Sequence, residues 1–497
     1  MNTTNPLRQK GGFRFTDFLI NNNVTILFVI LCVVAYFVSG TNLTFLLPEL
    51  FTRISRNTFL VLSLLIPVIA GLGLNFSIVI GAVAAQIAIF LVVLWGFKGF
   101  TGLLLCIAIC TPLAIFFGWL VGALFNRMKG TEMIGGMVAG YFSDGLYQFL
   151  FLFIFGGLIK IDSPLMISTG IGVKNTINLQ DNLKYSLDNV SMLRILEVAF
   201  WAILGVCACI LVFRLIKKQA LKIKKILLVV IPTIVLYALT YIPAIERFLA
   251  TDRLLLLDAI TIGVIVVVAY SLYQIVRMKL VKKQPGLPLK QILLIAGALL
   301  LYLLTHIPAL EVALIAVRLP VLTYLCIGGL CLFIPWFTNT RLGQNMRTVG
   351  QNRGVATSAG INVDRTRIIA MIMSTVLASY GQLISLQNIG TVSTYGSHLQ
   401  VGQFAIAALL VGGASTQKAT IKQGILGVIL FHTLFILSPL AGKALLGNAQ
   451  IGEYFRVFVA YGVIAVALAM HAWHIVAPKV KKVNGSKEAP LPETETK

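Results

Sequence analysis

Residues 102–125 read GLLLCIAICTPLAIFFGWLVGALF, an apolar stretch without a single charged side chain. A helix needs about 20 residues to cross the ~30 Å hydrocarbon core of a bilayer. Because no water is present there to satisfy the backbone, an apolar stretch of this length is expected to be helical. It therefore predicts a transmembrane helix.

Similar apolar stretches recur along the chain. Of its 497 residues, 58% are hydrophobic and 11% are charged, whereas soluble proteins carry about 25% charged residues. We predict an all-α integral membrane protein, a polytopic helical bundle of about 14 transmembrane helices. The predicted spans are residues 19–39, 57–73, 78–96, 102–125, 133–156, 195–213, 226–243, 254–276, 291–308, 319–337, 368–390, 402–415, 423–441 and 456–473.

The basic residues are distributed unevenly between the two sides of the predicted bundle. With the N-terminus inside, 28 of the 40 lysines and arginines fall in cytoplasmic segments. This bias follows the positive-inside rule, so the net charge of +23 indicates topology and no nucleic-acid partner. We expect one transmembrane domain at 18–478 between cytoplasmic tails at 1–17 and 479–497.

Motifs for nucleotide or metal chemistry are missing from the chain. It contains no GxxxxGK[ST], HExxH, CxxC or GxSxG sequence. We therefore expect no enzyme, and no metal or cofactor held by this chain itself. The seven cysteines fall within predicted spans, where buried thiols are expected.

The middle of the chain contains an internal repeat with an offset of 65 residues. This offset superposes the Ile-Pro-Ala-x-Glu sequence at 242–246 on the one at 307–311, and Arg253 on Arg318. The repeat predicts two duplicated hairpins, at about 217–283 and 289–345, whose prolines end a helix where the chain leaves the membrane. Two units are too few for a solenoid, which indicates an insertion into an older scaffold.

A few polar side chains fall at membrane depth. Asp144 is the only acid placed well inside a predicted span, and such a residue is a functional candidate by default. Its alternative role is a hydrogen bond to neighbouring hydroxyls. The amides of Gln86, Gln148, Gln382 and Gln387 suit a pathway for a neutral, hydroxyl-rich solute, but they serve equally well as interhelical contacts.

The inner segment at 338–367 contains TRLGQNMRTVGQNRGVATSAGINV at 340–363. It is too polar to span the membrane and too patterned for a plain loop. Val355 to Ala359 predict a short helix that Gly360 closes. Arg347 and Arg353 are expected to be solvated rim charges, which contribute little. The alternative is a solvated basic loop.

This segment resembles the coupling region of permeases of ribose-type ATP-binding-cassette importers. The family pattern is T-x-x-G-R-x-x-R-A-x-G-x-N-x-x-A-A-x-x-x-G-I, and Gln344, Thr348 and Val355 depart from it. Residues 407–415 (AALLVGGAS) are similar to the family's A-A-x-x-x-G-G-x-S, and residues 73–77 (GLNFS) to its G-I-D-L-S. The resemblance covers about 18–216 and 319–473. The matching residues of the first pattern are Thr340, Gly343, Arg347, Gly350, Asn352, Ala356, Gly360 and Ile361.

The resemblance implies a type II importer permease of about ten family helices, to which the duplicated hairpins add four. It implies contact with the ATPase subunits at Gly350, Asn352, Val355, Ala356, Ala359, Gly360 and Ile361. It also implies a solute path past Asn75, Phe76 and Ser77, with Asp144 and the amides Gln382, Gln387 and Gln403 as further candidates.

The implied partners are two cytoplasmic ATPase subunits that hold ATP and magnesium, a second permease subunit and an extracytoplasmic solute-binding lipoprotein. The implied location is the cytoplasmic membrane of a prokaryote, crossed many times, with both termini inside. Sugars and nucleosides are the implied solutes. Two alternatives stay open, a secondary transporter driven by an ion gradient and a membrane enzyme. An adjacent cassette ATPase gene would favour the importer.

Overall fold

The computed structural model describes residues 22–167, 170–217, 223–278, 289–448, 450–458, 461–462 and 465. The predicted tails at 1–17 and 479–497 and most of the predicted span at 456–473 lie outside the described residues. The chain divides into two compact units, unit 1 (residues 1–40 and 403–497) and unit 2 (residues 41–402).

Unit 1 is built on two long helices that pack together, α2 (Asn23–Ser39) and α19 (Ile421–Leu446). The end of α18 (Ser397–Val411) joins them, and Thr25 donates a hydrogen bond to the Val411 carbonyl at 3.2 Å. A Cβ atom on Gly412 would lie 1.9 Å from the Gln423 carbonyl oxygen. Close packing therefore explains why the AALLVGGAS stretch needs a glycine there.

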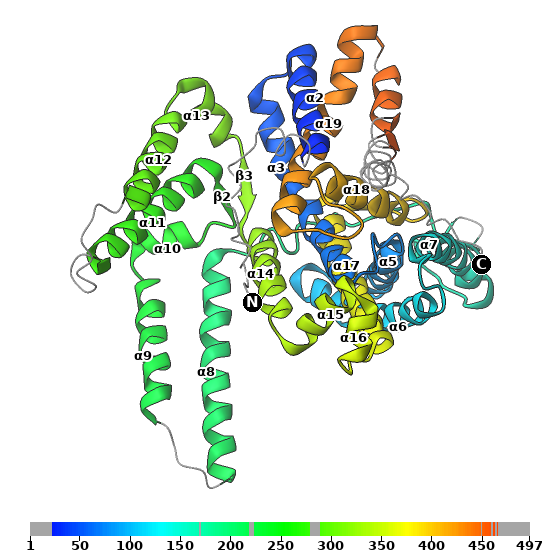
Figure 1. The fold of residues 1–497 in the computed structure, drawn as a ribbon, viewed down its shortest axis with the longest axis horizontal. Coiled ribbons are helices and arrows are strands. Elements are labelled where there is room, and N and C mark those ends of the chain that lie inside the picture. Colours follow the sequence, from blue (N-terminus) through cyan, green and yellow to red (C-terminus); the bar gives the residue numbers. More distant parts are fainter. Residues whose placement is uncertain are drawn as a thin grey trace, which may run out of the picture. The chain divides into compact units, whose positions relative to one another are not determined.

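Unit 2 contains most of the described helices and four short strands (Figure 1). Its first half comprises α3 (Leu43–Ser63), α4 (Leu65–Ile69), α5 (Ile78–Leu94), α6 (Gly99–Arg127), α7 (Glu132–Phe149), the π-helix η1 (Leu150–Leu158), β1 (Thr176–Asn178) and α8 (Met192–Ile216). Its second half comprises α9 (Ile223–Leu239), α10 (Pro243–Leu249), β2 (Arg253–Leu255), α11 (Leu256–Val276), α12 (Leu289–Thr305), α13 (Pro308–Ile315), β3 (Arg318–Pro320), α14 (Val321–Thr338), α15 (Arg341–Gln351), α16 (Arg353–Ser358), α17 (Val363–Ile389), β4 (Thr391–Ser393) and the start of α18.

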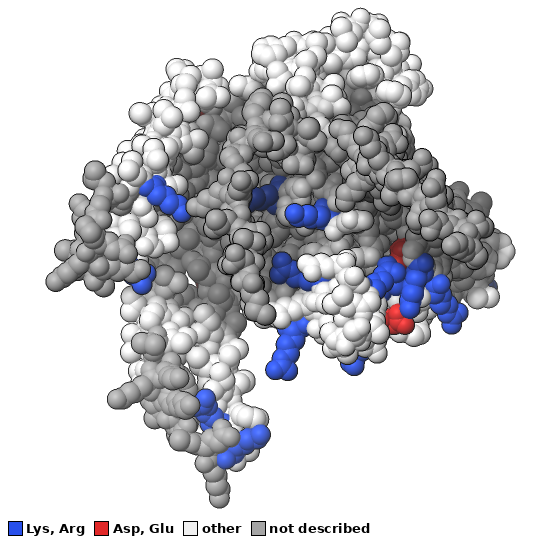
Figure 2. All heavy atoms as spheres, in the orientation of Figure 1, with Lys and Arg blue, Asp and Glu red and all other residues white. Residues whose placement is uncertain are grey.

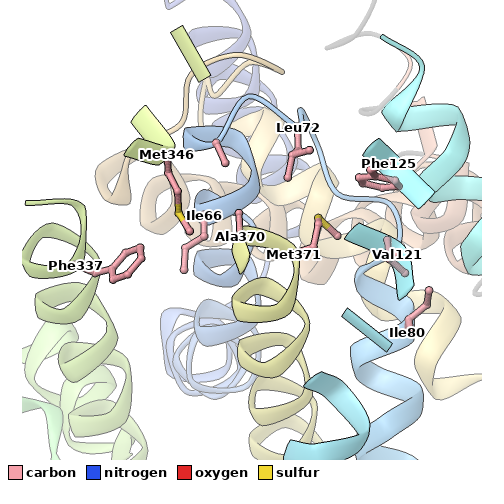
Figure 3. Close-up of a cluster of buried hydrophobic side chains, with 10 residues drawn as sticks. Ile66, Leu72, Ile80, Val121, Phe125, Phe337, Met346, Ala370 and Met371 are labelled. Atoms are coloured by element: carbon pink, nitrogen blue, oxygen red, sulfur yellow. The ribbon is translucent and has the colours of Figure 1, made fainter. Parts of the chain in front are cut away.

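The central helix of unit 2 is α17, which packs against α3, α5 and α6. A cluster of buried side chains gathers around it (Figure 3). Met371 of α17 belongs to this cluster, as do Val121 and Phe125 of α6 and Met346 of α15. Because Met346 is buried in the same cluster, the polar segment that contains α15 is anchored to the membrane helices.

The helical membrane fold is confirmed, whereas the count of 14 spans is not. Among the described residues, eight helices are long and apolar enough to cross a membrane, or nine if the bent pair α12–α13 is one span. Four shorter apolar helices accompany them. The span predicted at 57–73 is wrong at its start, since α3 begins at Leu43. The charged side chains in the first part of α3 have partners, which lowers the cost of placing them in the membrane. Arg53 pairs with Glu49 at 2.8 Å, and Arg56 donates a hydrogen bond to Asn388.

The two predicted hairpins share one order of elements. Each has a long helix, a short helix with proline in its first turn, a three-residue strand and another long helix. Pro243 and Pro308 thus begin α10 and α13, where proline is favoured, besides ending the helices before them. Glu246 and Glu311 lie in the first turns of these short helices. The duplication itself stays a prediction.

The strands of the two hairpins pair with each other. β2 and β3 are antiparallel, and Leu254 lies opposite Leu319. These two leucines are also 65 residues apart, so the central pair joins repeat-equivalent positions. Arg253 and Arg318 flank this pair on opposite sides. This pairing is what a local two-fold relation between the repeats requires.

The pairing predicts a disulfide between cysteines placed at Leu254 and Leu319. Residues directly opposite in an antiparallel pair have Cα atoms about 4.5–5.5 Å apart, within the range that a disulfide spans. In a background without native cysteines, oxidation of Leu254→Cys/Leu319→Cys should change migration on a non-reducing gel. Leu254→Cys/Arg318→Cys is the control, because the side chains at these two positions point to opposite faces of the two-stranded sheet. Equal cross-linking of both pairs would contradict this register.

Candidate functional site

The inner segment folds into two short helices with side-chain caps. Thr340 accepts a hydrogen bond from the Gly343 amide ahead of α15, and Asn352 accepts one from the Val355 amide ahead of α16 at 3.1 Å. Such caps satisfy amides that have no partner within the helix. Gly360 follows α16 with a φ of +76°, a conformation that favours glycine. The short helix and its glycine end are therefore confirmed.

The two faces of α16 have different surroundings. Val355 is 58% exposed, and Ala359 and Gly360 are exposed as well, while Ile361 is half-buried. Ala356, in contrast, is 0% exposed. The methyl group of Ala356 is thus packed inside this chain, and its predicted contact with an ATPase stays a prediction.

The end of α15 lies directly against the loop that follows α4. A Cβ atom on Gly350 would lie 2.2 Å from the Ile69 carbonyl oxygen, and one on Gly71 would lie 2.6 Å from the Gly350 Cα. Only glycine allows two backbones to approach this closely. Gly350 therefore joins the inner segment to the loop at 70–77, which also contains Asn75.

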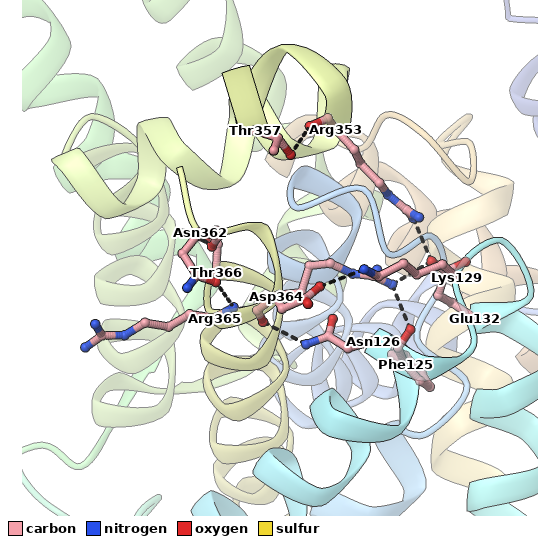
Figure 4. Close-up of polar contacts among 11 residues, drawn as sticks. Phe125, Asn126, Lys129, Glu132, Arg353, Thr357, Asn362, Asp364, Arg365 and Thr366 are labelled. Atoms are coloured by element: carbon pink, nitrogen blue, oxygen red, sulfur yellow. Dashed lines mark hydrogen bonds and ion pairs between the residues drawn. The ribbon is translucent and has the colours of Figure 1, made fainter. Parts of the chain in front are cut away.

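Behind α16 lies a buried ion-pair cluster that we call the Glu132 clamp, made of Glu132, Arg353 and Arg367 (Figure 4). The Nη2 atoms of both arginines lie 2.6 Å from the same Glu132 Oε1 atom. The side chains of Glu132 and Arg367 are 8% and 0% exposed, and that of Arg353 is 37% exposed. Glu132 also accepts from the Gly130 amide at 2.9 Å, and Arg367 donates to the Phe125 carbonyl at 3.1 Å.

The clamp changes the interpretation of one arginine. Arg353 is predicted to be a solvated rim charge, yet it pairs with a buried carboxylate. Neither Glu132 nor Arg367 is among the predicted site residues, since both adjoin the membrane ends of apolar stretches and resemble topology signals. Figure 2 shows many basic side chains and few acidic ones over the region of α15 and α16.

The loop at 70–77 is held by a hydrogen-bond chain. Asn75 donates to Ser374 Oγ at 3.2 Å and accepts from the Ser77 amide at 3.0 Å and from the Ser77 hydroxyl. Ser374 in turn donates to the Ser63 carbonyl at 3.1 Å. Asn75 and Ser77 are buried, whereas Phe76 is half-buried. Phe76 is therefore the best placed of the three to touch a solute, and the role of all three stays a prediction.

Asp144 has a partner that the sequence did not indicate. His398 Nε2 lies 2.7 Å from Asp144 Oδ1, and His398 Nδ1 lies 3.0 Å from Gln86 Oε1. The Tyr147 ring packs on the His398 ring with 4.8 Å between centroids, and Gln148 donates to Asp144 at 3.0 Å. These side chains come from α5, α7 and α18. Carboxylate, imidazole, amide and phenol groups at membrane depth can recognise a neutral solute with several hydroxyl groups.

The predicted pathway glutamines differ in their surroundings. Gln387 donates to Asp188 at 2.9 Å and accepts from the Leu187 amide, so it holds the segment before α8. Gln382 is 1% exposed, and neither of its amide atoms has a hydrogen-bond partner among the described residues. Gln403 belongs to unit 1. Gln387 thus joins the end of α17 to the segment before α8, and Gln382 keeps its hydrogen-bonding capacity.

The outer segment at about 161–194 packs on the end of α17. Strand β1 pairs with β4, which follows α17 directly. Asp188 is 1% exposed and accepts hydrogen bonds from Thr323, Gln387 and Asn388. This polar segment is therefore a fixed part of unit 2.

Comparison with known proteins adds a family to this geometry. Residues 203–468 match the family model described as branched-chain amino acid transport system / permease component. The chain belongs to this family. The matched range includes the hairpins, the inner segment and α17.

Three curated relatives align over shorter stretches. A nucleoside ABC transporter permease protein of Lactococcus lactis is 28% identical over 153 residues, which is 30% of this chain and 46% of the relative. The D-allose transport system permease protein of Escherichia coli is 26% identical over 160 residues (31% and 45%). The galactose/methyl galactoside import permease protein of Haemophilus influenzae is 30% identical over 113 residues (22% and 33%). The chain spans less than half the length of these relatives, and no solved structure matches it.

The Asn75 hydrogen bonds predict a structural defect in Asn75→Leu. The variant leaves the Ser77 amide without its buried acceptor, which costs about 1–3 kcal/mol. Its melting temperature in detergent should fall. Asn75→Asp keeps the acceptor and carries no charge once it is protonated, so at low pH it should lower the melting temperature less than Asn75→Leu does. If Asn75→Leu melts like the wild type but transports poorly, Asn75 contacts the solute directly.

Proposed function

We propose that this chain is the permease subunit of an ATP-driven importer of the ATP-binding-cassette class. Its membership in a family of transport permeases and the descriptions of its relatives as permeases support this proposal. None of the three relatives named above is described as a gradient-driven carrier or an enzyme. The observation that carries the proposal is the capped helix α16, whose small exposed side chains suit a groove on a cytoplasmic ATPase.

The proposed solute is a sugar or a nucleoside. The family description names branched-chain amino acids, whereas the relatives are described by nucleosides, allose and galactose. An amino acid carries two charges that call for charged partners at membrane depth. The group around Asp144 offers one carboxylate paired with an imidazole, beside amide and phenol groups. Such a group favours a neutral solute with hydroxyl groups and a flat apolar face.

The proposed assembly contains two permease subunits, two ATPase subunits or domains and an extracytoplasmic binding lipoprotein. ATP and magnesium are held by the ATPases, and this chain binds no cofactor. The assembly lies in the cytoplasmic membrane of a prokaryote with both termini inside. When the ATPases close, they move α16, and access to the solute path changes from one side to the other.

Val355 and Ala356 give a matched test of ATPase docking, because they are adjacent but face opposite ways. Val355→Asp should reduce solute-stimulated ATP hydrolysis by the reconstituted complex at least tenfold, the effect of losing about 1.4 kcal/mol at an interface. Its melting temperature should stay unchanged. Ala356→Trp should instead destabilise the isolated permease by about 1–3 kcal/mol through overpacking. Full stimulation with Val355→Asp would contradict docking at α16.

The orientation predicts where the inner segment is accessible. Single cysteines at Gln351 and Ser358 replace exposed side chains. Both should react with a membrane-impermeant maleimide in inverted vesicles and stay unlabelled in intact cells. A cysteine at Asp162, in the outer segment, is the control and should give the opposite pattern. Labelling of Ser358→Cys from outside would refute the topology and ATPase docking with it.

A further inference from the structure

The helix α7 is held at two points by acidic side chains that lie at different heights along it. Glu132 lies in its first turn, and Asp144 follows 12 residues later. At 1.5 Å per residue, about 18 Å of helix separates them. Glu132 contacts the inner segment through Arg353, and Asp144 contacts α18 through His398. One rigid helix therefore joins the inner segment to the polar group at membrane depth.

Between these two points, α7 passes close to the loop at 70–77. A Cβ atom on Gly136 would lie 3.4 Å from the Ser77 amide nitrogen, and one on Gly140 would lie 3.6 Å from the Phe76 carbonyl oxygen. The described residues of the chain cover little of the rest of α7. Only 22% of the most apolar stretch of α7–η1 is buried, compared with 61% for α17. α7 is therefore the helix with fewer restraints, and α17 is the fixed one.

The Glu132 clamp connects these two helices with α16. Arg367 belongs to α17 and is completely buried, so it gives Glu132 a fixed contact. Arg353 begins α16 and is partly exposed, so its contact moves with α16. Both bonds end on one oxygen of Glu132. Arg367 Nε and Nη1 have no hydrogen-bond partner in the part of the chain that the structure describes, so the cluster has capacity for other contacts.

We infer that Glu132 couples the motion of α16 to α7, and we call this coupling contact the joint. Arg353 is its mobile partner and Arg367 is its fixed partner. The inference rests on the proposed function. Glu132 and Arg353 are positioning residues, since they act on the solute path through α7. When α16 is displaced, Arg353 moves Glu132 and with it α7. This movement shifts Asp144 of α7 relative to His398 of α18.

A nearby ion pair that is exposed to solvent serves as a comparison. Lys129 and Asp364 lie 3.1 Å apart, but their side chains are 51% and 55% exposed. Water and salt screen such a pair, so it transmits little force. The contact between Arg353 and Glu132 is screened less, because the carboxylate is 8% exposed and the arginine 37%. The same neighbourhood thus contains a stronger link between α16 and α7 and a weaker one between the turn after α6 and α17.

The test is Arg353→Gln, with Arg347→Gln as its control. Both remove one positive charge from the inner segment, but Arg347 is exposed and Arg353 contacts Glu132. Arg353→Gln leaves the Glu132–Arg367 pair in place, so the permease should fold and bind the ATPases as the wild type does. Solute moved per ATP hydrolysed should fall at least tenfold in proteoliposomes. Arg347→Gln should stay within twofold of the wild type, and Arg353→Lys should recover part of the loss.

Three outcomes separate the possibilities. Wild-type coupling in Arg353→Gln would overturn the joint and leave the importer assignment intact. Loss of ATPase binding in Arg353→Gln would also overturn it, because Arg353 would then be a docking residue. If the wild-type complex shows no ATP-dependent uptake, the proposed function fails before the joint is tested. Glu132→Gln, measured beside these variants for melting temperature and coupling, should lose coupling as Arg353→Gln does.

Discussion

A polar side chain on a membrane helix must find its partners inside the protein, because lipid offers none. In unit 2 this requirement is met mainly by α17. Arg367 near its start binds Glu132, Ser374 in its middle accepts from Asn75, and Gln387 near its end binds Asp188. The inner segment, the loop at 70–77 and the outer segment are thus all fastened to one helix, which fixes the frame against which α7 is held.

What could be predicted from the sequence is local. Apolar length predicts the helices, and the small residues from Val355 to Ala359 before Gly360 predict the short helix and its glycine end. These features need only a few neighbouring residues to form. The start of α3 is the exception, because the predicted span begins too late in the chain. Hydropathy treats Arg53 as unfavourable in the membrane, although Glu49 lies one turn before it and pairs with it.

The missed contacts are those between distant parts of the chain. Arg353 and Glu132 are 221 residues apart, and His398 and Asp144 are 254 residues apart. A single sequence does not tell which charges meet, because this depends on how the helices pack. For the same reason the inward face of Ala356 could not be predicted, although its place in α16 could. A family-like pattern marks a small residue without telling whether the permease or a partner needs it small.

The excess of basic over acidic residues in the chain explains why Arg353 and Arg367 share the carboxylate of Glu132. With 40 basic and 17 acidic residues, more than half of the lysines and arginines have no acid to pair with. An exposed arginine needs none, because water solvates it and the positive-inside rule accounts for its place. A buried arginine does need one, since an unpaired charge in a low dielectric is costly. Glu132 therefore serves two arginines at once, one exposed enough to move and one too buried to leave. A carboxylate bound in this way follows its mobile partner only as far as its fixed partner allows, which limits how far α16 can displace α7.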